Sequence, residues 1–378
     1  MNIGYDAKRA FNNNTGLGNY SRMLISGQCA IAPHAQIVLY TPRVAAQHKA
    51  WAATLPNARI ITPQFPYSLC PSLWRTAAES LSIKRHDITL FHGLSHELPL
   101  FLPHKVKSIV TMHDLIVWRF PHYFSLPDRL IHKAKQRYAC NKATAIVAIS
   151  EQTKQDLVEI MHVDPSRIEV IYQSCDPIFW QPTSAQQVEQ TLQKYKLPAQ
   201  YVVCVGTVEE RKNQLSVIQA LQHIPTDIAL VMVGRSRGKY GKSVEQAIAS
   251  LPNSRKVVWL TNASFADFPA LYRGAIASIY MSHFEGFGIP VLESLCCGTP
   301  VLTSNCSSMP EAGGEAALYA SPSDPEAIAT QLLRIISDTD LQKNLRQKAE
   351  AHCRKFAPQK VANDMHQLYC KLLGTTID

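Results

Sequence analysis

The stretch that decides the fold is residues 277–300, ASIYMSHFEGFGIPVLESLCCGTP. It opens as a short apolar strand and continues into a loop that contains Gly286 and Gly288. A helix is predicted to begin near Pro290, because proline suits the first helical turn. The free N–H groups and the dipole at such a helix start attract phosphate. The stretch therefore predicts an α/β protein with an anion site at the carboxyl end of a strand.

Similar strand-to-helix units are predicted along the whole chain. A first strand begins at the N-terminus, and the further apolar runs are 37–40, 88–91, 107–112, 145–149, 168–172, 201–205, 228–233, 257–260, 277–280 and 300–303. Most of these runs are apolar on both faces, which is typical of parallel sheets covered by helices. Strands that alternate with helices predict right-handed βαβ units in doubly wound sheets.

A chain of 378 residues is long enough for two such domains. The periodic pattern stops after Tyr172, and a proline-containing linker is predicted at about 177–186. We therefore predict one Rossmann-like domain over 1–178, together with the tail 358–378, and a second over 179–357. The stretch 341–373 is helical by pattern but is broken at 356–358, where Pro358 ends or kinks a helix.

The composition is that of an ordinary soluble globular protein, with 46% hydrophobic and 18% charged residues. No stretch approaches the roughly 20 apolar residues of a membrane-spanning helix. The N-terminus has no basic and apolar signal segment, so a cytoplasmic location is expected. The ten cysteines include no Cys-x-x-Cys pair, which favours buried, reduced thiols over zinc or disulfide frameworks.

The net charge of +9 lies mostly in residues 1–180, where 19 basic residues face 12 acidic ones, a difference of +7. Such an excess suits nucleic acid, an anionic membrane or a phosphorylated substrate. No nucleic-acid-binding motif supports the first partner. The predicted helix 129–142 has a basic side and a mostly apolar face at Leu130, Ile131, Ala134 and Tyr138. A solvated surface helix is favoured, and docking to the inner membrane face is the alternative.

Two carboxylates, Glu285 and Glu293, flank the glycine loop and the predicted start of its helix. Carboxylates accept hydrogen bonds from vicinal hydroxyls, which sugars and ribose carry. Each glutamate alone is equally well explained by a favourable charge near a helix N-terminus or by an exposed surface position. The whole segment favours a sugar or nucleotide site over that structural alternative.

The motif EGFGIPVLE, followed by CGTPV, resembles the signature of the retaining family 4 glycosyltransferases, which have the GT-B fold. The resemblance implies that Glu285 contacts hydroxyls of the donor sugar and that Glu293 binds the nucleotide ribose. It also implies that the backbone at Phe287, Gly288 and Ile289 serves sugar and phosphate.

A second motif, VGTVEERKN at 205–213, ends a strand and is predicted to open a helix. Arg211 and Lys212 side by side form a strong diphosphate clamp, arginine by bidentate bonds and lysine as a point charge. The motif resembles VGTLEPRKN of the same family, which implies that these cations neutralise the departing diphosphate and that Gly206 lies at the donor. A pair of surface cations is the alternative.

Two segments of the first domain resemble the family as well. Residues 14–22, NTGLGNYSR, resemble its GIGRYT loop, which implies that Gly16 and Gly18 approach the donor phosphates; a plain tight turn is the alternative. Residues 111–115, TMHDL, resemble its T-x-HD-L motif, which implies that His113 faces the reacting sugar. Asp114 is expected to orient this loop or to cap the next turn.

Three further features are weaker. The segment at Ser150 and Lys154 resembles the family's SxxSK segment near donor or acceptor, although a helix N-cap explains Ser150 equally well. Residues 304–314 resemble an SSLPEVAG-type turn whose role is equally well architectural. The family also implies that the C-terminal helix crosses back to the first domain and that closure of the two domains brings His113 to the donor.

These residues favour electrostatic catalysis with no metal and no cofactor, because cations and helix N-termini can stabilise the leaving diphosphate. The one Asp-x-Asp, Asp338 to Asp340, lies between helical segments and is interpreted as a helix cap rather than a metal site. The resemblance favours retention by front-face attack. A glycosyl group trapped on any carboxylate of the chain would overturn that hypothesis.

Resemblance to the mannosyltransferase branch suggests GDP-mannose as donor, with UDP-hexoses second. The basic first domain, with a stretch at 62–78 rich in proline and aromatics, suits a glycan or lipid-linked acceptor. The rival enzyme is a GT-B-fold nucleotide-sugar epimerase, which needs no acceptor. The rival from another class is a non-catalytic sugar-nucleotide-binding protein.

Overall fold

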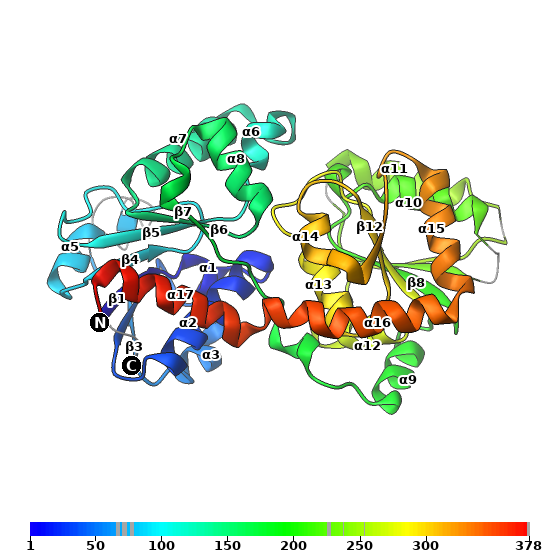
Figure 1. Cartoon of the computed structure of the whole chain (residues 1–378), viewed down its shortest axis with the longest axis horizontal. Coiled ribbons are helices and arrows are strands. Elements are labelled where there is room, and N and C mark those ends of the chain that lie inside the picture. Colours follow the sequence, from blue (N-terminus) through cyan, green and yellow to red (C-terminus); the bar gives the residue numbers. More distant parts are fainter. Residues whose placement is uncertain are drawn as a thin grey trace. The chain divides into compact units, whose positions relative to one another are not determined.

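The computed structural model describes residues 1–65, 69, 74–75, 79–224, 228–236, 238–252 and 254–375. The chain divides into two units, Met1–Ser174 with Phe356–Asp378 and Cys175–Lys355 (Figure 1). The prediction of domain closure concerns the placement of these units relative to each other, and it stays a prediction.

The first unit is built on a seven-stranded sheet with the order β3-β2-β1-β4-β5-β6-β7. Its strands, all parallel, are β1 Asn2–Asp6, β2 Gln36–Tyr40, β3 Ala58–Ile61, β4 Leu90–Gly93, β5 Lys107–Met112, β6 Ala145–Ala148 and β7 Ile168–Val170. Its helices are α1 Lys8–Asn12, α2 Gly16–Ile31, α3 Lys49–Ala53, α5 Glu79–Arg85, α6 Ile116–Arg119, α7 Leu126–Lys142, α8 Glu151–Met161 and α17 Pro358–Leu373. Alternate residues of β2 point into two separate cores, one on each face of the sheet.

The second unit has a six-stranded sheet with the order β10-β9-β8-β11-β12-β13. Its parallel strands are β8 Tyr201–Val205, β9 Ala229–Val233, β10 Val257–Leu260, β11 Ala277–Tyr280, β12 Val301–Ser304 and β13 Ala317–Ala320. Its helices are α9 Ala185–Lys194, α10 Gln214–Ala220, α11 Gly238–Ala249, α12 Phe268–Arg273, α13 Ile289–Cys296, α14 Met309–Gly313, α15 Pro325–Ser337 and α16 Thr339–Cys353. Two doubly wound parallel sheets confirm the predicted fold class.

Two strands were not predicted from the sequence, and both lie at the edges of their sheets. β3 is only partly buried and contains Arg59, so it has no continuous apolar run. β13 has the sequence ALYA, which contains no β-branched residue. Edge strands with one open side need less apolar sequence than central strands, and their pattern is correspondingly weak.

The strand order reverses between β1 and β4 in the first sheet and between β8 and β11 in the second. In doubly wound sheets, ligands bind outside the carboxyl ends of the strands at this reversal. In the first unit, a ligand is therefore expected at the loops after β1 and β4. In the second unit, it is expected at the loops after β8 and β11.

Helix α7 includes the predicted basic helix and lies on the surface of the first unit. Its buried residues are Gln136, Ala139 and Cys140. Leu130 and Ile131, which the helical pattern placed on its apolar face, are 60% and 52% exposed. These two residues point outward, whereas Tyr138 of the same predicted face packs against the core that contains Ala139 and Cys140.

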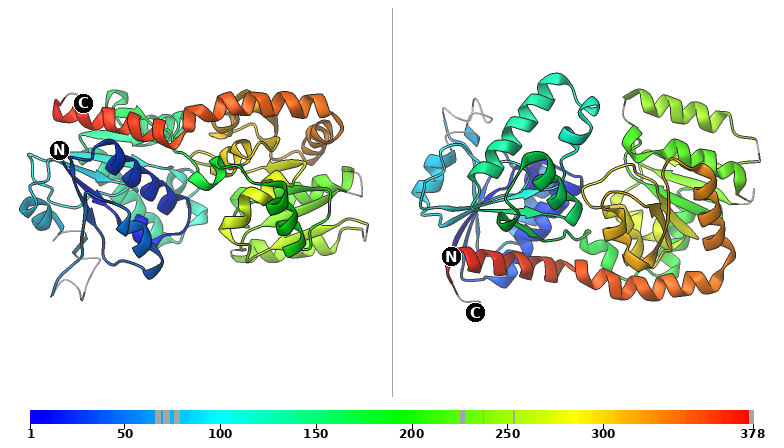
Figure 2. Two further views of the ribbon diagram at one scale, coloured as in Figure 1. Left: turned by 90° about the horizontal axis from the view of Figure 1, so that it is seen from below. Right: turned by 45° about the horizontal axis from the view of Figure 1, so that its top comes forward.

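The C-terminal helix α17 belongs to the first unit and packs against α2 (Figure 2). The Gln28 amide donates to the carbonyl oxygen of Ala362 at 2.6 Å, and the Gln28 Oε1 lies 3.1 Å from Nδ1 of His366. Gly27 permits this approach, because a Cβ added there would lie 2.6 Å from the Cβ of Ala362. The tail of the chain thus completes the first unit.

Gly27→Ala should therefore destabilise the first unit, because overpacking a close contact typically costs about 1–3 kcal/mol. Gly16→Ala is the matched control in the same helix, since a Cβ there meets nothing within 4 Å. We expect the control to be neutral or stabilising. Urea unfolding measures both variants, and equal stabilities would contradict this account of the α2–α17 contact.

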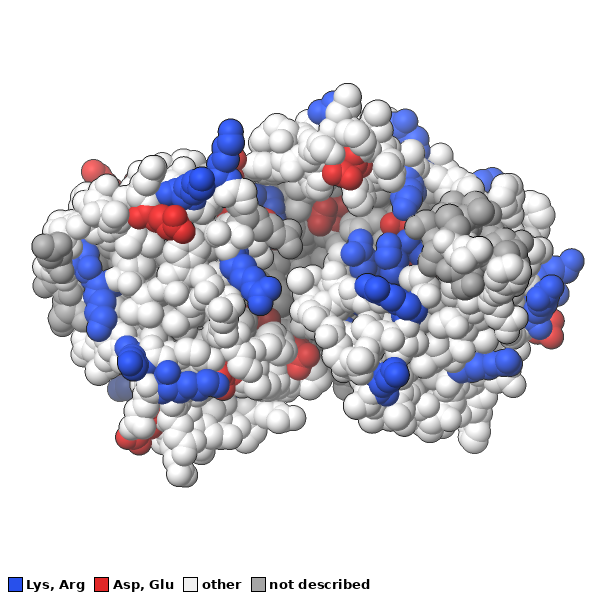
Figure 3. Space-filling view, turned by 180° about the vertical axis from the view of Figure 1, so that it is seen from behind, with Lys and Arg blue, Asp and Glu red and all other residues white. Residues whose placement is uncertain are grey.

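Nine cysteines lie in the described part of the chain, and all nine are free thiols, as predicted. Within that part, no helix is both long and apolar enough to cross a bilayer. On the face shown in Figure 3, lysines and arginines are scattered over both units and outnumber acidic side chains. Most of the stretch 62–78 that was assigned to the acceptor lies outside the described residues.

Candidate functional site

In the second unit, two glycine turns lie at the sheet's reversal point. Gly206 directly follows β8 with a φ of +146°, and Gly288 precedes α13 with a φ of +122°. Side chains rarely adopt these angles. A Cβ at Gly288 would also lie 2.7 Å from the methyl group of Met309. Glycine is thus required at both turns, where backbone can approach a ligand closely.

Arg211 and Lys212 lie in a 3₁₀ turn, Glu210–Lys212, between β8 and α10. The sequence predicted that they open the helix, but Asn213 takes a left-handed conformation with a φ of +56°, and α10 begins only at Gln214. The carbonyl oxygen of Arg211 accepts a bond from the backbone N–H of His283 at 2.8 Å. The loop after β8 is thereby tied to the loop after β11.

Glu285 joins both cations. Its carboxylate lies 2.7 Å from Arg211 Nη1 and 3.5 Å from Lys212 Nζ. Tyr280 at the end of β11 completes the group, because its hydroxyl accepts from Lys212 at 2.7 Å and donates to Glu285 at 2.6 Å. Arg211 also pairs with Glu209 at 2.7 Å. Two cations and two carboxylates therefore share one partly buried cluster.

Burial alone would raise the pKa of Glu285, but Lys212 and then Arg211 outweigh it and lower the pKa to about 2. The carboxylate therefore stays ionised throughout the neutral range. An ionised, fully hydrogen-bonded carboxylate accepts hydrogen bonds from hydroxyls but is a poor general acid.

Two serines that the sequence left as an architectural turn hold the glycine loop in place. The Ser307 hydroxyl accepts from the Glu285 N–H at 3.0 Å and donates to the Glu285 carbonyl at 2.7 Å. The Ser308 hydroxyl is within 2.7 Å of the Phe287 carbonyl oxygen. Sequence reasoning missed this role, because nothing in the spacing connects residues 307 and 308 to residue 285.

Glu293 lies in α13 and is only 7% exposed. The Tyr272 hydroxyl donates to its Oε2 at 3.0 Å. Burial raises the pKa of Glu293 to about 8, although the bond from Tyr272 works in the opposite direction. The side chain is therefore largely protonated at neutral pH, so it can both donate and accept hydrogen bonds.

Because its pKa is raised in the folded protein, protonated Glu293 stabilises the fold. This stabilisation is fully present below pH 4.5, the ordinary pKa of a glutamate, and it is lost as the pH rises through about 8. Glu293→Gln, a neutral side chain of the same shape, should remove that loss. We expect the variant to unfold at least about 2 °C above wild type at pH 9, with little difference at pH 5. Calorimetric melts at both pH values measure this, and a variant less stable at pH 9 would contradict it.

In the first unit, His113 follows β5 and is 4% exposed. Its Nε2–H donates to the Leu94 carbonyl oxygen at 2.9 Å, which leaves Nδ1 as an acceptor. Tyr20 packs edge-on against the ring at 4.8 Å, and the His96 ring centre lies 5.4 Å away. Burial, with a further contribution from His96, lowers the pKa of His113 to about 3. The imidazole is neutral at physiological pH.

A buried hydrogen-bond network lies behind His113. His92 on β4 bonds to the Thr111 hydroxyl at 2.8 Å through Nε2 and to the Tyr369 hydroxyl at 2.6 Å through Nδ1. Thr111 in turn bonds to the Tyr20 hydroxyl at 3.1 Å. Helix α17 thus supports the strand end that carries His113. These contacts join residues far apart in the sequence, so no local motif predicts them.

The sequence predicted that Gly16 and Gly18 lie in a loop after the first strand, but the structure places them in a helix. The short helix α1 follows β1, and both glycines lie in the first turn of α2. The Gly18 N–H bonds to the Asn13 side chain at 3.2 Å, and a Cβ at Gly18 would clash with the Asn13 carbonyl. Gly18 is therefore explained by packing, whereas Gly16 faces open space.

Two other predicted positions, Ser150 and Asp114, take local structural roles. Ser150 is the N-cap of α8 and accepts from the Thr153 N–H at 3.0 Å, which supports the helix-cap alternative. Asp114 accepts from the Ile116 N–H at 3.0 Å and so holds the turn after His113. Lys154 is half-buried in the first turn of α8.

The Asp-x-Asp segment is a helix cap, as predicted. The Asp338 carboxylate accepts from the Leu341 N–H at 2.8 Å at the start of α16. Asp340 is exposed and pairs with Lys343 at 3.4 Å. In the described part of the chain, no group of three or more His, Cys, Asp or Glu side chains is arranged to hold a metal ion.

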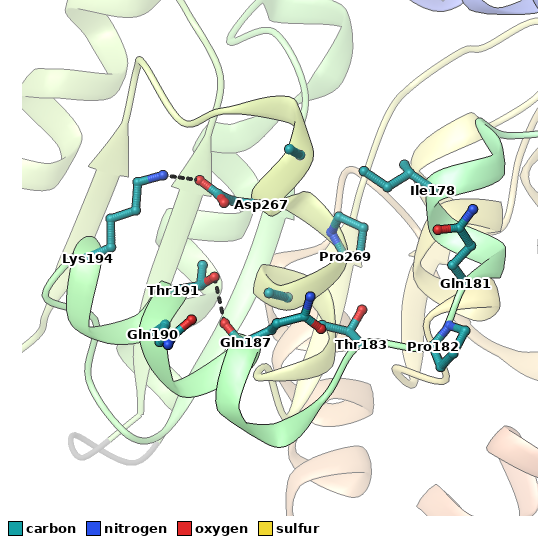
Figure 4. Close-up of a pocket in the computed structure, with 12 residues that line it drawn as sticks. Ile178, Gln181, Pro182, Thr183, Gln187, Gln190, Thr191, Lys194, Asp267 and Pro269 are labelled. Carbon is teal, nitrogen blue, oxygen red and sulfur yellow. Dashed lines mark hydrogen bonds and ion pairs between the residues drawn. The ribbon is translucent and has the colours of Figure 1, made fainter.

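The second unit also contains a cavity of about 440 Å³ between α9, α12 and the segment that precedes α9 (Figure 4). An ion pair of 2.6 Å between Lys194 and Asp267 lies in its wall. None of the predicted site residues lines it, and it is distinct from the cluster at Glu285.

In the comparison with known families, each half of the chain matches a glycosyltransferase model. Residues 16–178 match the model of Glycosyltransferase Family 4, and residues 188–352 match that of Glycosyl transferases group 1. The chain belongs to the family 4 glycosyltransferases. This family assignment was predicted from the motifs at Glu285, Arg211 and His113, and it is confirmed.

Its relatives include bacterial mannosyltransferases. The O-antigen chain mannosyltransferase B of Escherichia coli is 28% identical over 285 residues, which are 74% of this chain and 73% of that protein. RfbU of Salmonella typhimurium, another O-antigen chain mannosyltransferase, is 28% identical over 61% of this chain and 60% of RfbU. The serotype-specific mannosyltransferase WbdA of Escherichia coli is 26% identical over 76% of this chain but only 37% of WbdA.

Solved structures share the fold of the whole glycosyltransferase. A glycosyltransferase from Rickettsia africae has a TM-score of 0.76 at 16% identity and covers 100% of this chain and 99% of its own. Anabaena HepE in complex with UDP-glucose has a TM-score of 0.75 at 18% identity, with 98% and 100% covered. The comparisons favour neither the epimerase nor the non-catalytic alternative.

Proposed function

We propose that this glycosyltransferase moves mannose from GDP-mannose to a glycan or lipid-linked acceptor, with retention of anomeric configuration and without a metal. The observation that carries the proposal is the cluster of Arg211, Lys212 and Glu285 at the strand reversal of the second unit. It combines two cations for a diphosphate with a carboxylate for hydroxyls, beside two glycine turns that admit a ligand.

In this proposal, Arg211 and Lys212 hold the diphosphate of the donor and stabilise the charge that develops as it leaves. Such stabilisation acts in a partly buried site, where cations interact more strongly than in water. Glu285 accepts hydrogen bonds from the sugar, Glu293 binds the ribose, and the backbone at Gly206 and Gly288 lies against the phosphates. His113 of the first unit faces the reacting sugar as a neutral imidazole.

Retention by front-face attack is supported by how Glu285 is bonded. Its carboxylate is already engaged by Arg211, Lys212 and Tyr280, and its low pKa makes it a weak nucleophile. The departing phosphate then helps to deprotonate the acceptor. Mass spectrometry of the protein after donor turnover tests this, because a glycosyl adduct on Glu285 would establish double displacement instead.

The donor is tested by thermal melts in a panel of nucleotide sugars. The mannosyltransferase relatives favour GDP-mannose over UDP-glucose and UDP-galactose. A ligand at 100 times its dissociation constant stabilises the folded state by about 2.7 kcal/mol, which a melt resolves readily. We expect the largest shift with GDP-mannose. A larger shift with a UDP-hexose would replace mannose in the proposal, and no shift with any donor would contradict the proposal itself.

Lys212→Ala should lower kcat for donor turnover by about 10²–10³-fold, the usual effect of losing one group that stabilises transition-state charge. Lys194→Ala is the matched control, because Lys194 pairs with a carboxylate in the same unit but lines a separate cavity that includes none of the predicted site residues. We expect the control to keep activity within about twofold. Equal activity in the two variants would remove Lys212 from the mechanism.

Metal independence rests on the two cations, since they supply the charge that a divalent ion supplies in other diphosphate-leaving reactions. We expect turnover in excess EDTA to stay within about twofold of the untreated rate. A loss of more than about tenfold that Mg²⁺ or Mn²⁺ restores would show that a metal is required.

The acceptor is proposed to meet the first unit, and a lipid-linked acceptor would bring that unit to an anionic membrane. Helix α7 supports this, because Leu126, Leu130 and Ile131 are exposed beside Arg129 and Lys133. Exposed apolar residues next to basic ones are typical of helices that lie on a membrane surface. Co-sedimentation with vesicles containing phosphatidylglycerol tests the contact, and binding no stronger than to neutral vesicles would reject it.

A further inference from the structure

The first unit contains a cavity of about 280 Å³ at the carboxyl ends of its strands. Asp6, the last residue of β1, and Glu97, in the segment after β4, lie in its wall together with Arg75. The cavity therefore opens at the reversal point of this sheet, where doubly wound folds bind ligands. Its volume is close to the lower end of ligand pockets, about 300–1,000 Å³, and suits one small ring.

The charged groups of the wall form one connected cluster. Arg75 pairs with Asp6 at 3.1 Å and also with Glu97, which in turn pairs with Lys135 at 3.1 Å. The arginine is therefore already neutralised by two carboxylates, and little positive charge is left for a phosphate. This arrangement favours an uncharged polar ligand over an anion.

The buried position of Glu79 is not explained by the ion pairs of the wall, because Glu79 takes part in none of them. Its side chain is fully buried and lines the cavity, yet neither carboxyl oxygen has a hydrogen-bond partner within the described ranges. Buried polar groups in proteins are nearly always hydrogen-bonded. Burial, and then Asp6, raises the pKa of Glu79, while Arg75 opposes them. A protonated carboxyl group both donates and accepts, which matches a hydroxyl.

The other residues that line the cavity are largely apolar. They include Leu98, Pro99 and Leu100, and Tyr138 of α7, whose hydroxyl lies 3.4 Å from the Pro99 carbonyl oxygen. A lining that combines carboxyl groups with apolar and aromatic side chains suits a sugar ring, which has hydroxyls on its rim and C–H groups on its faces.

We propose that this cavity binds a sugar ring of the acceptor, with Glu79, Asp6 and Glu97 reading its hydroxyls and Tyr138 and Leu98 packing against its apolar face. The proposal rests on the proposed transferase function. Glu97 in the cavity wall directly follows His96, whose ring centre lies 5.4 Å from that of His113.

The test is ligand-observed saturation-transfer NMR on the full chain. The probes are methyl α-D-mannopyranoside, methyl β-D-glucopyranoside and the methyl glycoside of N-acetyl-β-D-glucosamine. Ala134→Leu blocks the cavity from the exposed side of α7, so the variant should fold normally. Asn141→Leu adds the same side chain at an exposed position of that helix that does not line the cavity. Glu79→Leu removes the unpartnered carboxyl group.

We expect at least one glycoside to bind wild type and Asn141→Leu equally, and to bind Ala134→Leu and Glu79→Leu at least tenfold more weakly. Binding that is the same in all four proteins, or absent with all three probes, would overturn the proposal. Melts with GDP-mannose on the same samples separate the two claims. A donor shift without glycoside binding rejects only the cavity, and glycoside binding at the cavity without a donor shift rejects only the donor proposal.

Discussion

The contact between Glu285 and the adjacent cations Arg211 and Lys212 is the interaction on which the site depends. Two cations side by side in a partly buried position repel each other unless a carboxylate lies between them. Glu285 provides that carboxylate at 2.7 and 3.5 Å, and Tyr280 bridges it to Lys212. A bound diphosphate would interact with the same cations, beside a carboxylate whose remaining lone pairs can accept bonds from sugar hydroxyls.

The rest of the second unit holds this cluster in position. Arg211 and Glu285 lie on loops after β8 and β11, neighbouring strands at which the sheet order reverses. The backbone bond from His283 to Arg211 joins these loops, and Ser307 fixes the backbone of Glu285 from a third loop. The first unit repeats the principle, because His113 and the Glu79 cavity lie at the carboxyl ends of its own strands.

The sequence predicted the parts of this account that local pattern determines. Short sequence motifs contain the buried central strands, the glycine turns and the residues of the cluster. The spacing of residues within these motifs was therefore enough to predict them. The supports could not be predicted in this way. Tyr369 bonds to His92, which lies 277 positions earlier in the sequence. Glu79 lines the cavity beside residues that are distant in the sequence, so no local pattern indicates its position. The α2 start at Gly16 was also missed, because α1 is too short for its periodicity to register.

Isothermal titration of wild-type protein with GDP and GMP, and in parallel with UDP and UMP, tests the central claim most directly. If Arg211 and Lys212 clamp the diphosphate, the preferred diphosphate should bind at least about tenfold more tightly than its monophosphate, since charge-assisted bonds are the strong ones. The difference should shrink as salt is added, because salt screens partly exposed charges. Equal affinities for diphosphate and monophosphate would contradict the account.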